Sequence, residues 1–104
     1  MDDFVLRGNL YELYGGLLNE NQRKVYEYHI MDDMSFTEIG EEIGVTRQAA
    51  QELFRRADKK LQEIEDTLGL QSKLIHLRRI AENINSKTND PEIRDLAGEI
   101  INGI

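Results

Sequence analysis

The sequence predicts an all-α protein in which a helix-turn-helix unit is followed by a C-terminal helical extension. Apolar residues recur at spacings of three and four along most of the chain, which is the period of an amphipathic helix. Glycine is sparse inside these stretches, and the single proline is Pro91. Two of the periodic stretches, between Ser35 and Ala50, are joined by a short turn that contains glycine, as in a helix-turn-helix. No segment has the pattern of a β-strand.

Two helices are expected before the helix-turn-helix. The first should run from about Asp3 to Tyr14, end at Gly15-Gly16, and carry a row of leucines, namely Leu6, Leu10, Leu13 and Leu17. The second should begin after Asn19, which can form a capping box with Gln22, and run to about Met31. Its buried side is expected to contain Val25 and Tyr28, with Tyr26 and Ile30 as further candidates.

A short helix is expected to lead into the turn. Ser35 and Glu38 have the spacing of a capping box, in which each side chain accepts a hydrogen bond from the backbone amide of the other residue. The helix that starts there should bury three apolar side chains, Phe36, Ile39 and Ile43. It should end at Gly44, because glycine accepts the left-handed conformation that turns the chain sharply.

The turn should deliver the chain into a much longer helix. Gly40 would let the two helices approach closely, Val45 would fill the angle between them, and Thr46 would cap the second helix. An apolar stripe on that helix continues as far as Gly69, through Ala50, Leu53, Phe54, Ala57, Leu61, Ile64 and Leu68. This helix is the one that would lie in a major groove of DNA.

The chain after Gly69 is expected to form a separate helical extension. One helix should carry Leu70, Leu74, Leu77, Ala81 and Ile84 and should end in a polar run, residues 85–89, that would act as a linker. Asp90 would cap a last helix with Pro91 at its first position. The predicted division is therefore a helix-turn-helix domain at residues 1–69 and an extension at residues 70–104.

The last helix has an apolar face that must be buried somewhere. This face contains Ile93, Leu96, Ala97, Ile100 and Ile101. It could fold back on its own domain or pair with a second copy of the chain. We favour a homodimer formed through Ile93, Leu96, Ile100 and Ile101.

Charge is distributed unevenly along the chain. The net charge is -7, yet residues 46–62 carry five basic against two acidic side chains, whereas residues 1–45 carry three against ten. Phosphate binding needs clustered cations, so only the long helix could supply them. The absence of cysteine favours the reducing cytoplasm, and no apolar run approaches the ~20 residues needed to span a bilayer.

The polar side of the long helix is the candidate binding surface. A helical wheel places Gln48, Gln51, Glu52, Arg55 and Lys59 opposite the apolar stripe, with Arg47 and Arg56 on its flanks. The candidate binding residues are those of this side apart from Glu52, together with the cap: Thr46, Arg47, Gln48, Gln51, Arg55, Arg56 and Lys59. Glutamine and arginine are side chains that recognise adenine and guanine or hold phosphates. Any solvated helix also has such a face, and Glu52 on the same helix, with Glu38, Glu41 and Glu42 before it, would repel a duplex.

Other functional sites have little support. His29, Asp32 and Asp33 form a weak candidate metal cluster, because no second histidine or cysteine completes a coordination shell, so no metal or cofactor is expected. No serine, threonine or lysine has the pattern of an activated nucleophile, and no phosphate-binding glycine loop occurs, which argues against an enzyme. The four tyrosines could stack on single-stranded RNA, but at helical spacing they are better explained as core residues.

The segment from Leu17 to Leu70 resembles the YlxM family of small bacterial proteins associated with the signal recognition particle. The resemblance rests on Leu18-Asn19-Glu20-Asn21-Gln22-Arg23, Ser35-Phe36-Thr37-Glu38-Ile39-Gly40-Glu41-Glu42, Val45-Thr46-Arg47-Gln48-Ala49 and Glu63-Ile64-Glu65-Asp66-Thr67-Leu68-Gly69-Leu70. It covers about half of the chain. The same stretch is more distantly similar to sigma-factor region 4, within the winged-helix-like DNA-binding superfamily.

The resemblance implies a DNA-binding-like fold, a role in regulating protein export and no catalysis. Three functions remain open. The protein could be an accessory regulator of the signal recognition particle pathway that acts on the particle's RNA, on its GTPase or on DNA, which is the preferred hypothesis. It could be a promoter-binding transcription regulator with phosphate contacts from Arg47, Arg55, Arg56, Lys59 and Lys60. It could also be a purely protein-binding helical module.

Overall fold

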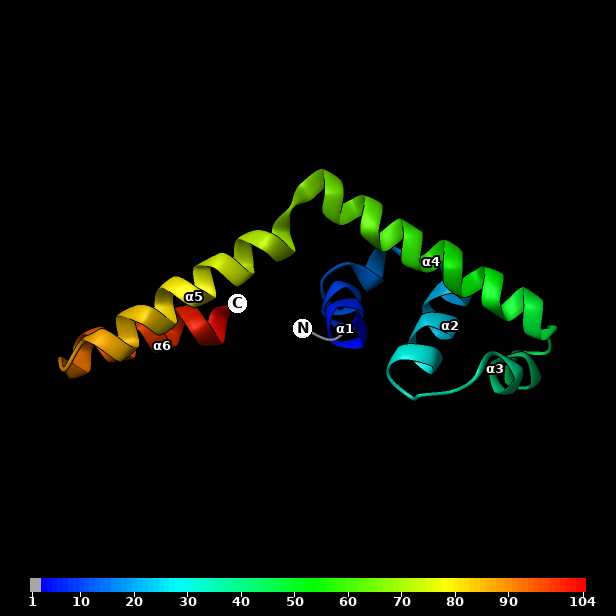
Figure 1. Cartoon of the computed structure of the whole chain (residues 1–104), viewed down its shortest axis with the longest axis horizontal. Helices are drawn as coiled ribbons and strands as arrows, with labels where there is room; N and C mark the ends of the chain where they lie inside the picture. The colour runs from blue at the N-terminus through cyan, green and yellow to red at the C-terminus, as the bar shows by residue number, and fades with distance from the viewer. Residues whose placement is uncertain (1–2) are drawn as a thin grey trace. The chain divides into compact units, whose positions relative to one another are not determined.

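The computed structural model describes residues 3–104, and the helical prediction is confirmed over this range. The elements in order are α1 (Asp3–Tyr14), the 3-10 turn η1 (Gly15–Leu17), α2 (Glu20–Ile30), α3 (Phe36–Ile43), α4 (Arg47–Leu68), α5 (Leu70–Lys87) and α6 (Pro91–Gly103) (Figure 1). They form two compact units, one up to Leu68 and one at Gly69–Ile104. None of the described helices is both long enough and apolar enough to span a membrane.

The first unit has its core around α4. The buried cluster takes side chains from α1, α2, α3 and α4 and from the loop before α2, namely Leu10, Tyr14, Leu18, Val25, Tyr26, Ile39, Ala50, Phe54, Ala57 and Leu61. Figure 1 shows α1, α2 and α3 following one another along the length of α4. The predicted stripe on α4 is confirmed from Ala50 to Ile64, whereas Leu68 at its end is 49% exposed.

Local signals in the sequence set the helix boundaries. In both predicted capping boxes the two reciprocal hydrogen bonds are present: between Asn19 and Gln22 at 2.8 and 3.2 Å, and between Ser35 and Glu38 at 3.1 Å each. Each box satisfies amides that the first turn of a helix leaves without a backbone acceptor. Asp90 likewise accepts from the Glu92 amide at 2.9 Å, ahead of Pro91 at the first position of α6.

The predicted leucine row of the first helix is wrong at its C-terminal end. Leu13 and Leu17 are 37% and 58% exposed, while Leu10 and Tyr14 are buried. The chain leaves the α-helix at Gly15 and forms a 3-10 turn, so Leu17 no longer continues the face that Leu10 begins.

The predicted linker at residues 85–89 is also wrong for the most part. Helix α5 continues to Lys87, and its last turn closes with a hydrogen bond from the Thr88 amide to the Ile84 carbonyl. The weak helix propensity of asparagine and serine is only a prior, and the packing of α5 against α6 overrides it. The connection between the two helices is short, so the second unit is a helical hairpin (Figure 1).

Candidate nucleic-acid interface

A tight turn fixes where α4 begins. Gly44 has φ 76° and ψ 35°, the left-handed conformation that costs a residue with a Cβ atom about 1–2 kcal/mol. The Val45 amide donates to the Gly40 carbonyl at 2.9 Å. A Cβ atom on Gly40 would lie 2.6 Å from the Val45 carbonyl oxygen, so the turn backbone packs directly against this glycine. The close approach expected at Gly40 is therefore between α3 and the backbone of the turn, rather than between the two helices.

Val45 does not have the role predicted for it. Its side chain is 37% exposed, and the fully buried residues at the junction of α3 and α4 are Ile39 and Ala50. Because the Val45 carbonyl is held against Gly40, the main chain takes the place between the helices that the sequence assigned to the valine side chain.

The N-terminus of α4 is capped by Thr46. The Ala49 amide donates to the Thr46 Oγ1 atom at 3.0 Å, and the Ala50 amide donates to the Thr46 carbonyl at 3.0 Å. This arrangement starts the helix one residue after the turn. It also fixes the rotation of α4, since Ala50 is buried and the preceding polar residues are left in solvent.

All seven predicted binding residues are exposed and lie on α4 or at its cap. We call this set the recognition face: Thr46, Arg47, Gln48, Gln51, Arg55, Arg56 and Lys59. The buried residues of the same helix are Ala50, Phe54, Ala57 and Leu61. Their spacing of three and four places Gln48, Arg55, Arg56 and Lys59 on the side of α4 away from the core, with Gln51 at the edge of that side. Thr46 and Arg47 are exposed because they stand at the N-terminal end of the helix.

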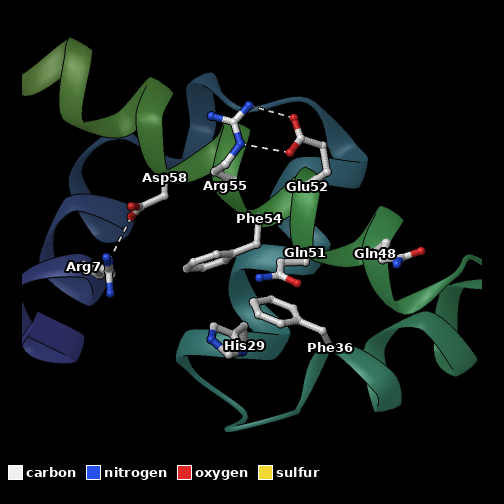
Figure 2. A pocket seen from close by; sticks show the side chains of 9 residues that line it. All are labelled: Arg7, His29, Phe36, Gln48, Gln51, Glu52, Phe54, Arg55 and Asp58. Carbon is white, nitrogen blue, oxygen red and sulfur yellow. Dashed lines mark hydrogen bonds and ion pairs between the residues drawn. The ribbon is translucent and has the colours of Figure 1, made fainter.

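Glu52 holds two of the arginines of the recognition face. Arg55 donates to both carboxylate oxygens of Glu52, at 2.9 and 2.7 Å, and Arg56 donates to one of them at 3.0 Å. Figure 2 shows the paired hydrogen bonds between Arg55 and Glu52. The hydrogen bond from Arg55, followed by that from Arg56, lowers the pKa of Glu52 to about 2, so this carboxylate is charged at neutral pH. The sequence predicted Glu52 only as a source of repulsion.

The remaining cations of α4 differ in their partners. Lys59 lies 3.9 Å from a carboxylate oxygen of Glu63, a loose pair one turn further along the helix. Lys60 donates to the Leu17 carbonyl at 2.7 Å and so anchors η1 to α4. Arg47 has no hydrogen bond or ion pair to another side chain within residues 3–104. It is the α4 cation most available to a phosphate.

A hollow of about 500 Å³ adjoins the recognition face. Its walls come from all four helices of the first unit: Arg7, His29, Phe36, Gln48, Gln51, Glu52, Phe54, Arg55 and Asp58. His29 stacks on Phe36 with ring centroids 4.3 Å apart and meets Phe54 edge-on at 4.7 Å. Figure 2 shows these three rings grouped together, with the Arg7–Asp58 pair to the left of Phe54 and the two glutamines on the side of α4. His29, a weak metal-ligand candidate in the sequence, also donates from Nδ1 to the Met34 carbonyl at 2.8 Å.

One wall of the hollow is a polar network that fixes α4 to α1 and α2. Asp58 accepts from Arg7 at 3.1 Å and from the Tyr26 hydroxyl at 3.1 Å. Burial of the Tyr26 ring raises the pKa of its hydroxyl, and the adjacent Asp58 carboxylate raises it further. Arg7 and Asp58 are separated by 51 positions, so no local pattern could have paired them. Glu52 lies three and four positions before its arginines, a helical spacing from which its ion pairs were predictable.

Comparison with known proteins identifies similar chains in several bacteria. Residues 3–99 match the family model UPF0122, described as "Putative helix-turn-helix protein, YlxM / p13 like". A UPF0122 protein of Thermoanaerobacter sp. strain X514 is 34% identical over 95% of this chain and 91% of its own length. One from Halalkalibacterium halodurans is 35% identical over 92% and 93%, and one from Shouchella clausii is 42% identical over 70% and 68%. The match includes most of the C-terminal hairpin, which the sequence resemblance did not cover.

Proposed function

Since the chain belongs to the UPF0122 family of YlxM/p13-like helix-turn-helix proteins, we propose that it is a non-enzymatic cytoplasmic regulator that binds a nucleic-acid duplex through the recognition face. The observation that carries the proposal is the geometry of the turn and α4. A sharply capped helix begins at a left-handed glycine and presents Arg47, Gln48 and Gln51 to solvent in its first turns. In helix-turn-helix proteins these first turns contact base edges.

Each part of the recognition face has a distinct role in this proposal. Gln48 and Gln51 would contact base edges, because a carboxamide can bond the N6 and N7 atoms of adenine together. Arg47 would contact a phosphate directly. Arg55 and Arg56 would do so after exchanging the Glu52 carboxylate for a phosphate, which offers the same paired acceptors. Exposed ion pairs are weak in water, so this exchange is accessible.

The family resemblance suggests the signal recognition particle pathway as the setting. The ligand would then be the RNA of that particle, DNA near its genes, or the targeting GTPase. Base-paired RNA and DNA share the phosphate chemistry on which the recognition face depends, whereas the GTPase does not. Binding of the purified chain to a labelled DNA duplex, to the particle's RNA and to the GTPase would distinguish these ligands.

A salt titration of duplex binding tests the proposal. Up to four cations of the recognition face can neutralise phosphates and so release the counterions condensed on the duplex. The logarithm of the binding constant should therefore fall with the logarithm of the salt concentration, with a slope no steeper than about -3.6. Arg47→Glu should abolish binding measured by fluorescence anisotropy at low salt. Lys24→Glu is the matched control, since it changes the charge equally at an exposed position of α2 and should retain binding. If neither duplex binds at low salt, the proposal is wrong.

A purely protein-binding module is the second candidate, and the Glu52 ion pairs are the observation that favours it. They neutralise part of the cationic charge of α4 in a chain of net charge -7. Glu52→Gln separates the two functions. For a nucleic-acid ligand the substitution frees both arginines and should tighten binding several-fold. Glu20→Gln is the control, because it frees Lys24 on α2, which is not part of the recognition face, and should leave binding unchanged. For a protein ligand that pairs with the carboxylate, the same substitution should weaken binding.

A further inference from the structure

The C-terminal hairpin is left with much of its apolar surface in solvent. Within Gly69–Ile104 the fully buried hydrophobic side chains are Ala81 and Ala97, at 1% and 2% exposure. These small residues let α5 and α6 approach closely but bury little area. A two-helix unit this short does not enclose enough apolar surface to be stable by itself.

Most of the exposed apolar side chains of the hairpin form one row on each helix. We call them together the hairpin face: Leu77, Ile80 and Ile84 on α5, and Ile93, Leu96 and Ile100 on α6, with exposures between 39% and 60%. On both helices the spacing is three and four, so each row follows one side of its helix. Ile101, which the sequence placed in the same surface, is only partly exposed.

The two rows lie on the same side of the hairpin. Ile80 and Ile84 of α5 and Ile93 of α6 line a single hollow of about 430 Å³ next to the connection at Thr88. Figure 1 shows α6 running back alongside α5 from that connection. The hairpin face therefore spans both helices at this end of the hairpin, with a depression into which a side chain can insert.

The exposed area is unusual for a surface that remains in water. Six aliphatic side chains at these exposures leave on the order of 500 Å² of apolar surface, at the upper end of what a monomer exposes. A standard interface buries ~800 Å² per partner, a third or more of it polar. The hairpin face with a rim of polar neighbours reaches that size.

The charges of the hairpin indicate what covers it. Helix α5 carries Lys73, Arg78, Arg79 and Lys87 against Glu82, whereas α6 carries Glu92, Asp95 and Glu99 against Arg94. A second hairpin related by a twofold axis can place its acidic α6 along the basic α5 of the first, and the same contact then occurs twice. A partner of a single sign would complement only one of the two helices, and an uncharged partner would complement neither.

We propose that the hairpin face pairs with the hairpin face of a second copy of this chain, which gives a four-helix bundle with α5 of each copy along α6 of the other. The spacing of three and four on all four helices is that of side chains interdigitating in such bundles. The assembly carries two recognition faces, which strengthens binding to any ligand with two sites. The pairing is independent of whether that ligand is a nucleic acid.

Sedimentation equilibrium of the full chain tests the proposal without any ligand. The expected mass at micromolar concentration is twice that of the 12.1 kDa chain. Leu96→Lys places a cation in the hairpin face opposite the basic helix and should weaken dimerisation at least 100-fold. Leu17→Lys is the matched control, because Leu17 is 58% exposed against 60% for Leu96, and it should remain dimeric.

Two results would overturn the proposal. One is a wild-type chain that sediments as a monomer up to about 100 μM; if Leu96→Lys then also lowers its melting temperature, the hairpin face covers the chain's own first unit. The other is a Leu96→Lys variant that remains a dimer. Circular dichroism checks that the Leu96→Lys variant is folded. If it is unfolded, the same measurement is made on the milder Leu96→Ala variant, which should weaken dimerisation about tenfold.

Discussion

The two units of the chain follow the same helical pattern but differ in how they bury it. In the first unit four helices enclose a continuous cluster that contains Tyr26, Ile39 and Leu61 at 0% exposure. In the second unit two helices meet at Ala81 and Ala97 and leave many of their leucines and isoleucines about half exposed. An amphipathic helix therefore does not show by itself what it is packed against. The first unit is a self-contained fold, while the second has the composition of half an interface.

The largest expected effect comes from comparing one substitution in both units. Leu61→Ala removes a fully buried side chain and should lower the free energy of unfolding by about 2–5 kcal/mol, because the surrounding core cannot close the cavity. Leu96→Ala, at 60% exposure, should change it by less than about 1 kcal/mol in dilute, monomeric protein. Unfolding in urea, monitored by circular dichroism, measures the free energy of unfolding of both variants. Equal losses would contradict the contrast between the units.

The second prediction concerns the close approach inside the first unit. Gly40→Ala forces a Cβ atom to within 2.6 Å of the Val45 carbonyl oxygen, which is backbone and cannot rotate away. The turn must shift, at a cost of about 1–3 kcal/mol. Gly8→Ala is the control, because its Cβ atom would make an ordinary contact of 3.6 Å with Met31. Thermal unfolding should show a lower midpoint for the first variant only.

The third prediction concerns the polar network under the recognition face. Tyr26→Phe removes the hydrogen bond from the hydroxyl to Asp58 and should cost about 1 kcal/mol. The pKa of Tyr26 is raised in the folded chain above its ordinary value of 10.0. As pH rises past that value the unfolded chain loses the tyrosine proton first, so stability should fall.

The control for this pH effect is the variant itself. The loss of stability above pH 10 should be smaller in Tyr26→Phe than in the wild type, as measured by urea denaturation in a series of alkaline buffers. An identical alkaline loss in both proteins would mean that Tyr26 is not the group responsible.

Features set by neighbouring residues were predictable from the sequence. Both capping boxes, the left-handed Gly44, the Thr46 cap and the Asp90-Pro91 start of the last helix depend on side chains within a few positions of the backbone they bond. The buried stripe of α4 was predictable for a related reason, since one helical period repeats over its length. The predictions failed where the period changed or where partners were distant in sequence. Leu17 left its row at the 3-10 turn, and Arg7 met Asp58 across 51 positions.

The recognition face shows the same limit. The helical spacing predicts that Glu52 can reach Arg55 and Arg56, but the bonding of both arginines to the one carboxylate at the same time depends on side-chain rotamers that the sequence does not fix. Likewise the apolar residues of the last helix were identified, whereas their continuation on Ile80 and Ile84 became evident only once the two helices lay side by side.

The smallest expected effect sharpens the comparison from the side of the second unit. Gly98 lies within α6, and a Cβ atom there would meet nothing within 4 Å. Gly98→Ala should therefore raise stability by about 0.5–1 kcal/mol, because alanine loses less backbone entropy than glycine on entering a helix. Gly98 follows Leu96 by two positions, and the helical rotation between them takes it off the hairpin face. Dimerisation should be unchanged in sedimentation, whereas a loss of dimer would place a second copy against the opposite side of α6.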